Sequence, residues 1–534
     1  MKAEMTQPAP VVDTPSLDWI RDRPVPLDFG GPVDTPFRPL DEDTLAGVGM
    51  FERAAELWPD KLAVDDGEVA LTYAELLDRV HGLAHRVAAA TPPGGAVISV
   101  LNNGPAAIVA IVAALAAKRT SVPIDASHPV ERQSAILAQS GATAVILPEG
   151  EPAPDFLPAD LPRVTFDVTR PTGAPPYRNA QDPDVPAVVM FTSGSTGRPK
   201  GLAHSGSGGL IARYVARLHV NADDVFISLA SMSQTGAADL IALSTGATVQ
   251  VVDMKRRGIA AVLGVMASKG VTILSFVPSV LRSILAIPGA ERAFAKLRVL
   301  DLHGEKILAS DIRLFREKLP KDCAISVTYG STEAGGVFSW FVRDEAIEGA
   351  VTPLGYLAQD KQVAIIDPTG APTPPGEVGE LLVRGPMALG SWQNGKVSDA
   401  RFLPDPEDPT RRIYAMGDLV RMRPDGLFEF MGRHDRQTKV RGLWVDLGEI
   451  ESALLACDTV ADAVVTVAPT PGQTDTLAAF VVPADPAQPL DLPELRRRIS
   501  TATAEHMVPS AFKILERIPR LPNYKPDLQA LERL

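Results

Sequence analysis

A buried strand that runs directly into a loop of small residues constrains this chain more than any other feature. The apolar run 185–191 has the length and composition of a strand buried on both faces. Six small residues follow it without a break: Thr192, Ser193, Gly194, Ser195, Thr196 and Gly197. Their backbone N–H groups and hydroxyls can turn toward an anion, and Lys200 adds a positive charge. The stretch therefore predicts a phosphate-binding loop at the end of a sheet strand.

Two better-known motifs do not fit this spacing. A Walker loop needs four residues between its glycines, and Gly194 and Gly197 lie too close together for that. A hydrolase elbow needs glycine two positions before its serine, a position that Ser193 occupies before Ser195. A flexible Ser/Gly linker is the alternative, but the preceding strand and the Pro-Lys-Gly sequence at 199–201 do not suit a linker.

The rest of the chain alternates strand-like and helix-like patterns. Strand-like runs separated by helix-like segments occur at 97–101, 144–147, 248–252, 273–277 and 297–302. Such alternation predicts parallel sheets with helices on both faces. The proline-rich stretch 148–186 predicts a surface connector.

The chain of 534 residues is too long for one compact core. We expect an N-terminal arm over residues 1–50, an N-terminal domain over 51–434 and a C-terminal lid domain over 435–534. The fold class is α/β: parallel-sheet α/β subdomains and a small β subdomain make up the large domain, and a small, mobile α+β domain follows. Strand-like runs at 363–366 and 380–383 predict the β subdomain.

Composition excludes some classes of partner. The net charge of −13 argues against nucleic acid. The most apolar run, 106–117, is too short to span a bilayer, and we expect no membrane contact. Cys323 and Cys457 lie far apart and outside any metal-type spacing, which favours a reduced, cytoplasmic setting.

A second motif, Tyr-Gly-Ser-Thr-Glu at 329–333, directly follows the predicted strand 324–328. Ligand sites in open α/β sheets gather at the carboxyl ends of strands. An aromatic ring, a hydroxyl and a carboxylate there can stack a base, contact a phosphate and hold Mg²⁺. On its own the pentapeptide is equally compatible with a turn that buries a tyrosine.

The segment 192–201 resembles, at every fixed position, the signature loop of the adenylate-forming superfamily. That superfamily contains acyl-CoA synthetases, adenylation domains of nonribosomal peptide synthetases, and luciferase. Other segments similar to its motifs follow in order, at 329–333, 414–419, 432–442 and 518–527. Met416, Leu521 and Tyr524 depart from the pattern. The resemblance covers residues 51–534.

The resemblance implies a site that binds ATP and Mg²⁺. The phosphate loop comprises Thr192, Ser193, Gly194, Ser195, Thr196, Gly197 and Lys200. The adenine and ribose side comprises Gly304, Glu305, Tyr329, Gly330, Ser331, Asp418 and Arg433. Tyr329 stacks on adenine, Asp418 binds the ribose hydroxyls, and Arg433 contacts ribose or phosphate.

Catalytic and moving parts also follow from the resemblance. Lys525 corresponds to the catalytic lysine, Thr332 contacts phosphate and Glu333 ligates Mg²⁺. Asp435 is the hinge between the domains, and Gly442 leaves room for a pantetheine arm. Read alone, the segment 432–442 is a charged, solvated strand and Lys525 a solvated terminal lysine.

The substrate pocket departs from the pattern of α-amino-acid domains. In those domains the segment that corresponds to 231–235 ends in an aspartate that binds the α-ammonium, and here Thr235 holds that place, after Ser233. Asp239 downstream could pair with an ammonium on a more distant carbon, or it could be a helix N-terminal carboxylate. Acids without an amine, aliphatic or aromatic, fit equally well.

The implied reaction is ATP-dependent adenylation of a carboxylic acid, followed by transfer to a phosphopantetheine thiol. Because the chain ends soon after Lys525, we expect a separate acceptor, either CoA or a free-standing carrier protein. Ser331 stands where peptide-synthetase domains usually have proline, which leans toward acyl or aryl acid ligases. The alternative is a non-catalytic nucleotide-binding protein, against which Lys525, Glu333 and Asp418 argue together. A third possibility, a luciferase-like oxygenase, has no specific support.

Overall fold

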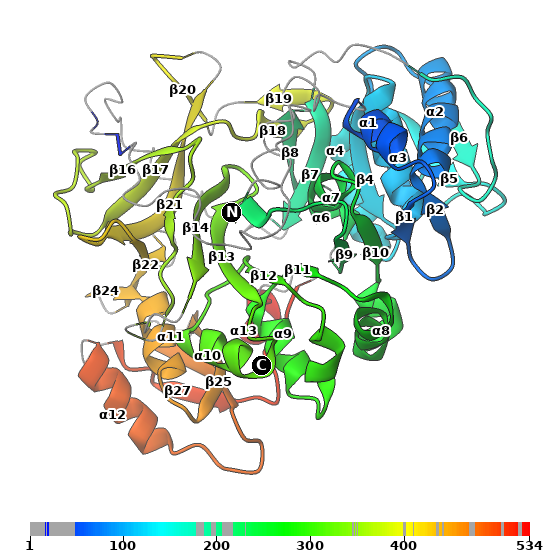
Figure 1. The fold of residues 1–534 in the computed structure, drawn as a ribbon. Coiled ribbons are helices and arrows are strands. Elements are labelled where there is room, and N and C mark those ends of the chain that lie inside the picture. The colour runs from blue at the N-terminus through cyan, green and yellow to red at the C-terminus, as the bar shows by residue number, and fades with distance from the viewer. Residues whose placement is uncertain are drawn as a thin grey trace.

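The computed structural model describes most of the chain, in segments. These are residues 17, 19–20, 49–177, 186–193, 199–205, 217–229, 231–235, 237–343, 347, 349, 351–398, 402–408, 411–433, 437–440, 443–468, 476–503, 507–521 and 526–534. Two large sheets form the centre, a smaller sheet lies beside them, and a C-terminal unit lies below (Figure 1). None of the described helices has the length and apolar character needed to cross a membrane.

The first large sheet has eight strands in the order β19-β18-β8-β7-β4-β3-β5-β6. They are β3 (Ala96–Leu101), β4 (Thr120–Asp125), β5 (Ala142–Pro148), β6 (Arg163–Phe166), β7 (Pro186–Ser193), β8 (Pro199–Ser205), β18 (Gly390–Gln393) and β19 (Lys396–Ser398). Strands β3 to β7 run parallel, whereas β8 pairs with β7 antiparallel. Every residue of β3 and β4 is buried, as expected for strands covered on both faces.

The second large sheet has nine strands in the order β15-β14-β13-β12-β11-β9-β10-β1-β2. They are β1 (Leu62–Asp65), β2 (Ala70–Thr72), β9 (Val225–Ser228), β10 (Thr248–Val251), β11 (Ile273–Phe276), β12 (Val299–Leu302), β13 (Ala324–Ser331), β14 (Gly335–Val342) and β15 (Tyr356–Leu357). The central strands run parallel, and the edge strands β2, β14 and β15 pair antiparallel.

Helices flank both sheets. They are α1 (Gly49–Leu57), α2 (Tyr73–Ala90), α3 (Pro105–Ala116), α4 (Val130–Ser140), α6 (Met232–Thr235), α7 (Ala237–Leu243), α8 (Met254–Lys269), α9 (Pro278–Leu285) and α10 (Ala309–Lys318), with a 3₁₀ turn, η3, at Ala290–Phe294. All of α3 except Ala106 is buried, because α2 and α3 share one core with strands of both large sheets. A helix enclosed in this way has no polar face.

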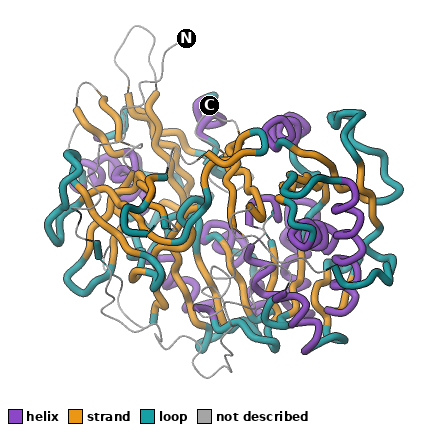
Figure 2. Tube along the Cα trace, turned by 90° about the horizontal axis from the view of Figure 1, so that it is seen from above, coloured by secondary structure: helices purple, strands orange, loops and turns teal. Residues whose placement is uncertain are grey.

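The smaller sheet has the order β16-β17-β21-β20, with β22 paired to β21. Its strands are β16 (Gln362–Ile366), β17 (Gly379–Gly385), β20 (Leu403–Pro404), β21 (Arg412–Met422) and β22 (Phe428–Arg433). This side of the molecule is mostly strand and loop, whereas helices surround the strands on the other side (Figure 2).

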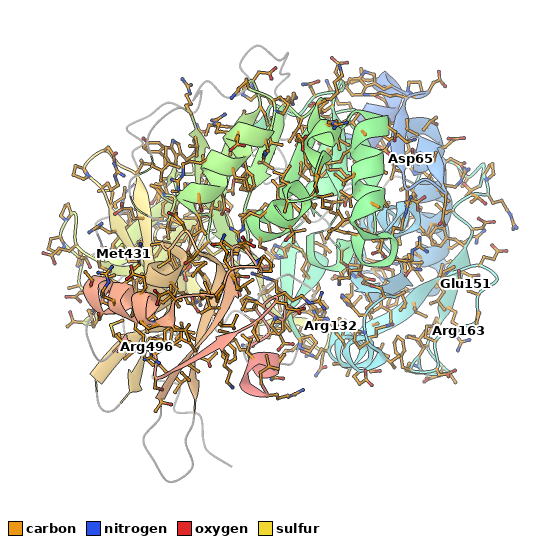
Figure 3. The ribbon with its side chains drawn as sticks, turned by 90° about the horizontal axis from the view of Figure 1, so that it is seen from below. Asp65, Arg132, Glu151, Arg163, Met431 and Arg496 are labelled. Carbon is orange, nitrogen blue, oxygen red and sulfur yellow. The ribbon has the colours of Figure 1, made fainter. Side chains whose placement is uncertain are left out.

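The C-terminal unit has its own cores. It contains β23 (Gln437–Val440) paired with β24 (Leu443–Asp446), α11 (Leu447–Leu455), α12 (Leu492–Ala502), α13 (Leu528–Glu532) and a sheet of β25 (Val460–Ala468), β26 (Thr476–Pro483) and β27 (Ala511–Ile514). The described members of this unit's two buried clusters all come from residue 445 onward. Seen from below, Arg496 of α12 and Met431 of β22 lie on one side of the molecule, and Glu151 and Arg163 on the opposite side (Figure 3).

The predicted fold class is confirmed. The Thr-x-x-Glu spacing of Thr72 and Glu75 predicts a capping box, and the structure confirms it, since each side chain accepts from the other residue's backbone N–H. Three boundaries were wrong. The connector 148–186 contains β6, which pairs with β5 at the end of the described sheet and alternates between exposed and buried residues. The sequence pattern predicts a helix that begins at Gly258, but α8 begins at Met254, because Asp253 caps its N-terminus and Gly258 only kinks it. Strand β13 does not end at residue 328 but continues to Ser331, along β14.

A buried ion pair in the smaller sheet should contribute strongly to stability. Arg384 of β17 donates to Asp405 at 2.5 and 2.7 Å, and both side chains are almost fully buried. Arg384→Met leaves the carboxylate without its cation, so we expect a loss of about 3–5 kcal/mol in urea unfolding. The matched control is Arg421→Met in β21, whose pair with Glu429 is partly exposed and should cost about 0–1 kcal/mol. Equal losses would contradict the assignment.

Candidate active site

The Tyr-Gly-Ser-Thr-Glu motif forms the end of β13 and the turn into β14. Gly330 faces Gly336 in this hairpin, and a Cβ atom on Gly330 would lie 2.1 Å from the carbonyl oxygen of Gly335. Glycine is therefore required at 330 by the approach of the two strands. One face of the Tyr329 ring stacks on Phe338 at 5.7 Å between centroids, and Phe338 stacks on Phe428 at 4.3 Å.

Asp418 connects the second large sheet to the smaller sheet. Its buried carboxylate accepts the hydroxyl hydrogen of Tyr329 on one oxygen and the Arg433 guanidinium, at 2.6 Å, on the other. Arg433 lies directly opposite Asp418 in the β21–β22 pairing. Burial and then the charge of Asp418 raise the pKa of Tyr329 well above its ordinary value, so the hydroxyl stays protonated and donates. Three residues predicted from separate motifs thus form one hydrogen-bonded group.

Gly304 and Glu305 follow β12. Gly304 has φ +86°, in the left-handed region that favours glycine, and the chain bends there after His303. The Glu305 carboxylate accepts from the backbone N–H of Ser279, at the N-terminus of α9, at 2.5 Å. A carboxylate in that position is stabilised by the helix dipole. Glu305 therefore holds the turn against α9.

A backbone bridge joins the Glu333 turn to the strand that carries Lys200. The N–H of Ala388 donates to the carbonyl of Glu333 at 2.8 Å, and the N–H of Leu389 donates to the carbonyl of Ala203 in β8 at 2.7 Å. Lys200 is exposed in β8, opposite Thr192 of β7. The two motifs are thereby linked, with Thr332 and Glu333 both half-buried.

The predicted pocket segment lies at the ends of β4 and β7, against which α6 packs. The Ser233 side chain is buried and forms a 2.8 Å hydrogen bond with that of Ser231. Burial raises the pKa of Asp125, at the end of β4, but hydrogen bonds from Ser127 and Ser231 outweigh it and lower that pKa overall. Thr235 belongs to α6 and Asp239 to α7, and their side chains lie outside the described part.

Several predicted residues lie outside the described part of the chain. They are Gly194, Ser195, Thr196, Gly197, Asp435, Gly442 and Lys525, and the side chains of Thr192 and Ser193. The sequence pattern after the phosphate loop also predicts a helix over 209–218; of that range only Arg217 and Leu218 are described, and both are helical.

Sequence reasoning missed a buried polar cluster around Asp301. One of its members, Thr328, directly precedes Tyr329 in the sequence. Asp301 of β12 accepts from Arg217 at 2.8 Å, from Thr328 at 2.8 Å and from Ser275 at 2.9 Å. Burial alone would raise the pKa of Asp301, but the charge and hydrogen bonds of Arg217, with the hydroxyl of Thr328, hold it well below its ordinary value. The available signal was a lone carboxylate in the apolar strand β12. Through these hydrogen bonds, Asp301 links β12 to its neighbours β11 and β13 next to the candidate site.

Comparison with known proteins identifies the class. The family model described as AMP-binding enzyme matches residues 51–392, and the AMP-binding enzyme C-terminal domain matches 449–525. The chain therefore belongs to the AMP-binding enzymes, the adenylate-forming superfamily that its motifs resemble.

Individual relatives are similar along most of this chain. Phosphinothricin tripeptide synthetase PhsB of Streptomyces viridochromogenes is 32% identical over 92% of the chain, which spans only 42% of that protein. A four-domain nonribosomal peptide synthetase bound to AMP and glycine shows 25% identity over 92% of this chain and 37% of its own, with a TM-score of 0.74. The amide bond synthetase McbA from Marinactinospora thermotolerans has the same fold, with a TM-score of 0.76 at 24% identity, over 91% of this chain and 99% of its own.

Asp301 should make stability pH-dependent in the acid range. Because its pKa is lower in the folded protein than in the unfolded chain, its contribution is complete above about pH 5 and is lost as the pH falls below about 4. We expect Asp301→Asn to be less stable at pH 7 and to lose less further stability on acidification, measured as urea midpoints between pH 7 and 3. Asp322→Asn, which removes an exposed carboxylate just before β13, should follow the wild type. An unchanged acid slope in Asp301→Asn would exclude this role.

Proposed function

We propose that this chain activates a carboxylic acid with ATP and then transfers the acyl group to a thiol. A carboxylate oxygen attacks the α-phosphorus, the bond from that phosphorus to the bridging oxygen breaks, and pyrophosphate leaves. The thiolate sulfur then attacks the acyl carbon, and AMP leaves with the oxygen of the broken C–O bond. Membership in the AMP-binding enzymes supports the first step.

The observation that carries the proposal is the group formed by Tyr329, Asp418 and Arg433. A carboxylate held by a tyrosine hydroxyl and a guanidinium has fixed oxygen positions. Such a preorganised acceptor suits the paired hydroxyls of a ribose. The Tyr329 ring, backed by Phe338 on one side, suits a base on its other side.

We infer that the phosphates bind near the β7–β8 hairpin. Charge develops on the phosphoryl oxygens during attack, so catalysis depends on cations and donors positioned in advance. Lys200, the 192–197 loop and Thr332 supply them from the large domain, and Lys525 supplies a charge from the C-terminal unit. The backbone bridge through Ala388 and Leu389 supports this grouping, because it ties the Glu333 turn to β8.

Glu333 would hold Mg²⁺. No group of three or more metal-ligating side chains occurs among the described residues. A single carboxylate is nevertheless sufficient for Mg²⁺, which usually takes one or two carboxylates and completes its shell with water and substrate phosphates. Bound there, the ion would neutralise charge on the phosphates.

Domain movement and the acceptor belong to the proposal as well. We place the domain boundary at 434/435, with Asp435 as the hinge, and Gly442 along the path of a pantetheine arm.

The acceptor would be CoA or a carrier protein, and the likeness to peptide synthetases supports the second. The likeness to an amide bond synthetase makes an amine the competing acceptor. Ser331 leans toward acyl or aryl acid ligases, whereas the 32% identity to a tripeptide synthetase supports an acceptor of the peptide-synthetase kind.

The substrate we propose is an acid other than an ordinary α-amino acid. Thr235 cannot supply the charge that the aspartate of α-amino-acid domains supplies, and an unpaired buried ammonium is costly. Asp239 in α7 is the candidate partner for an amine on a more distant carbon. Its position in the first turn of α7 equally suits a carboxylate that only stabilises the helix.

Pyrophosphate exchange across α-amino, β-amino and amine-free acids tests both the function and the substrate class. We expect exchange with at least one of the last two classes and little with standard α-amino acids. If the acid is a β-amino acid held by Asp239, Asp239→Asn should lower exchange with that acid and leave amine-free acids unaffected. Exchange with no acid would favour the non-catalytic nucleotide-binding alternative, and strong exchange with α-amino acids would overturn the substrate assignment.

Lys525 should serve adenylation and not acyl transfer. A lysine between the substrate carboxylate and the α-phosphate stabilises charge only in the first step. Losing one preorganised contact of this kind costs roughly 10²–10³ in rate. Lys525→Ala should therefore lose pyrophosphate exchange by about that factor and retain thiolation of a supplied acyl adenylate. Equal loss in both half-reactions would reject the role.

A further inference from the structure

A short loop begins after Arg520 and ends at Pro526, where its two ends pair. Arg520 and Pro526 form an antiparallel bridge, and the N–H of Asp527 donates to the carbonyl of Pro519 at 2.8 Å. On either side of this loop, Ile518 and Leu531 are buried in one core cluster with residues of β25 and β26. The base of the loop is therefore fixed to the C-terminal unit. By sequence, the residues that it encloses include Lys525.

The Arg520 side chain crosses from this base to the large domain. Its Nη1 lies 3.3 Å from Oε2 of Glu305, and its Nη2 lies 2.5 Å from Oδ2 of Asp462. Asp462 belongs to β25, so the second contact stays within the C-terminal unit and orients the guanidinium. Glu305 uses its other oxygen to accept from Ser279. The cross-domain contact thus ends on a carboxylate already fixed to α9.

The next residue of the large domain makes a second polar contact across the same junction. Nζ of Lys306 donates to the carbonyl of Gly448 at 3.1 Å and to the hydroxyl of Ser452 at 3.2 Å. Both acceptors lie on α11. Consecutive residues 305 and 306 therefore meet the C-terminal unit at two elements, the loop base and α11, which defines one relative position of the two parts.

We propose that Arg520 is a positioning residue, which holds the base of the Lys525 loop against the Gly304–Glu305 turn while the adenylate forms. The inference rests on the proposed function, since it concerns the first half-reaction. It adds a residue whose side chain contacts two carboxylates, those of Glu305 and Asp462. The side chains of Arg520, Glu305 and Asp462 are each about one-fifth exposed. Water and salt can therefore still reach the ion pair between Arg520 and Glu305.

The test separates the two half-reactions. Arg520→Ala should lower kcat for pyrophosphate exchange by up to about 100-fold, because a small displacement of a catalytic group can cost that much. The KM for the acid should hardly change, and thiolation of a supplied acyl adenylate should be retained. Arg520→Lys keeps the positive charge but loses the planar guanidinium that reaches both carboxylates, so it should recover part of the lost kcat.

The matched control is Arg517→Ala. Arg517 is exposed on the same segment and makes no ion pair with a described residue. Replacing it by alanine removes one positive charge, as Arg520→Ala does, but breaks no described ion pair. It should behave as the wild type in both half-reactions. If Arg520→Ala also matched the wild type, or lost both half-reactions equally, the proposal would be overturned while the proposed function stood.

A distance measurement tests the contact without any substrate. Spin labels on Ser310→Cys in α10 and Ser500→Cys in α12 report the separation of the two parts, and both native cysteines are buried. Arg520→Ala should broaden the distance distribution relative to the wild type, and Arg517→Ala should not. An unchanged distribution in Arg520→Ala would refute the positioning role even if no acid supported exchange.

Discussion

The arrangement of the candidate site depends on one buried carboxylate. Asp418 lies in the smaller sheet, and the Tyr329 hydroxyl that it accepts comes from the second large sheet. Arg433, on the strand paired to that of Asp418, neutralises its charge. A buried carboxylate is tolerated only when it is paired and hydrogen-bonded, so these three side chains must be correctly placed together. The requirement fixes the β subdomain relative to the strands that carry the nucleotide motifs.

A second constraint lies beneath the first. Asp301 binds Arg217, Ser275 and Thr328, the last of which precedes Tyr329 in β13, so the ends of β11, β12 and β13 cannot shift independently. The Gly304 turn follows β12, and Tyr329 lies in the adjacent strand β13. The site is therefore built on two layers of charge pairing, one inside the second large sheet and one between that sheet and the smaller one.

The sequence predicted the α/β class and the elements of strong periodicity, because burial on both faces or on one helix stripe leaves a clear pattern. Helix α2 was recognisable from its capping box and β3 from its continuous apolar run. The antiparallel β13–β14 pairing was not recognisable, because this hairpin depends on the close approach at Gly330, which no local pattern encodes. The Tyr329–Asp418–Arg433 group could be named residue by residue only through resemblance. Its hydrogen bonds, like those of Asp301, join segments far apart in sequence.

The separation of the hydrophobic cores has a thermodynamic consequence. Among the described residues, the two apolar clusters of the C-terminal unit include none before 445, and the other five include none after 430. The contacts made across the junction by Glu305 and Lys306 are polar. Heat capacity rises with the exposure of apolar surface, so breaking these polar contacts should change the heat capacity very little. Added salt, which screens exposed charge pairs, should favour the separated arrangement, and ionic strength rather than temperature would then tune the balance between the two half-reactions.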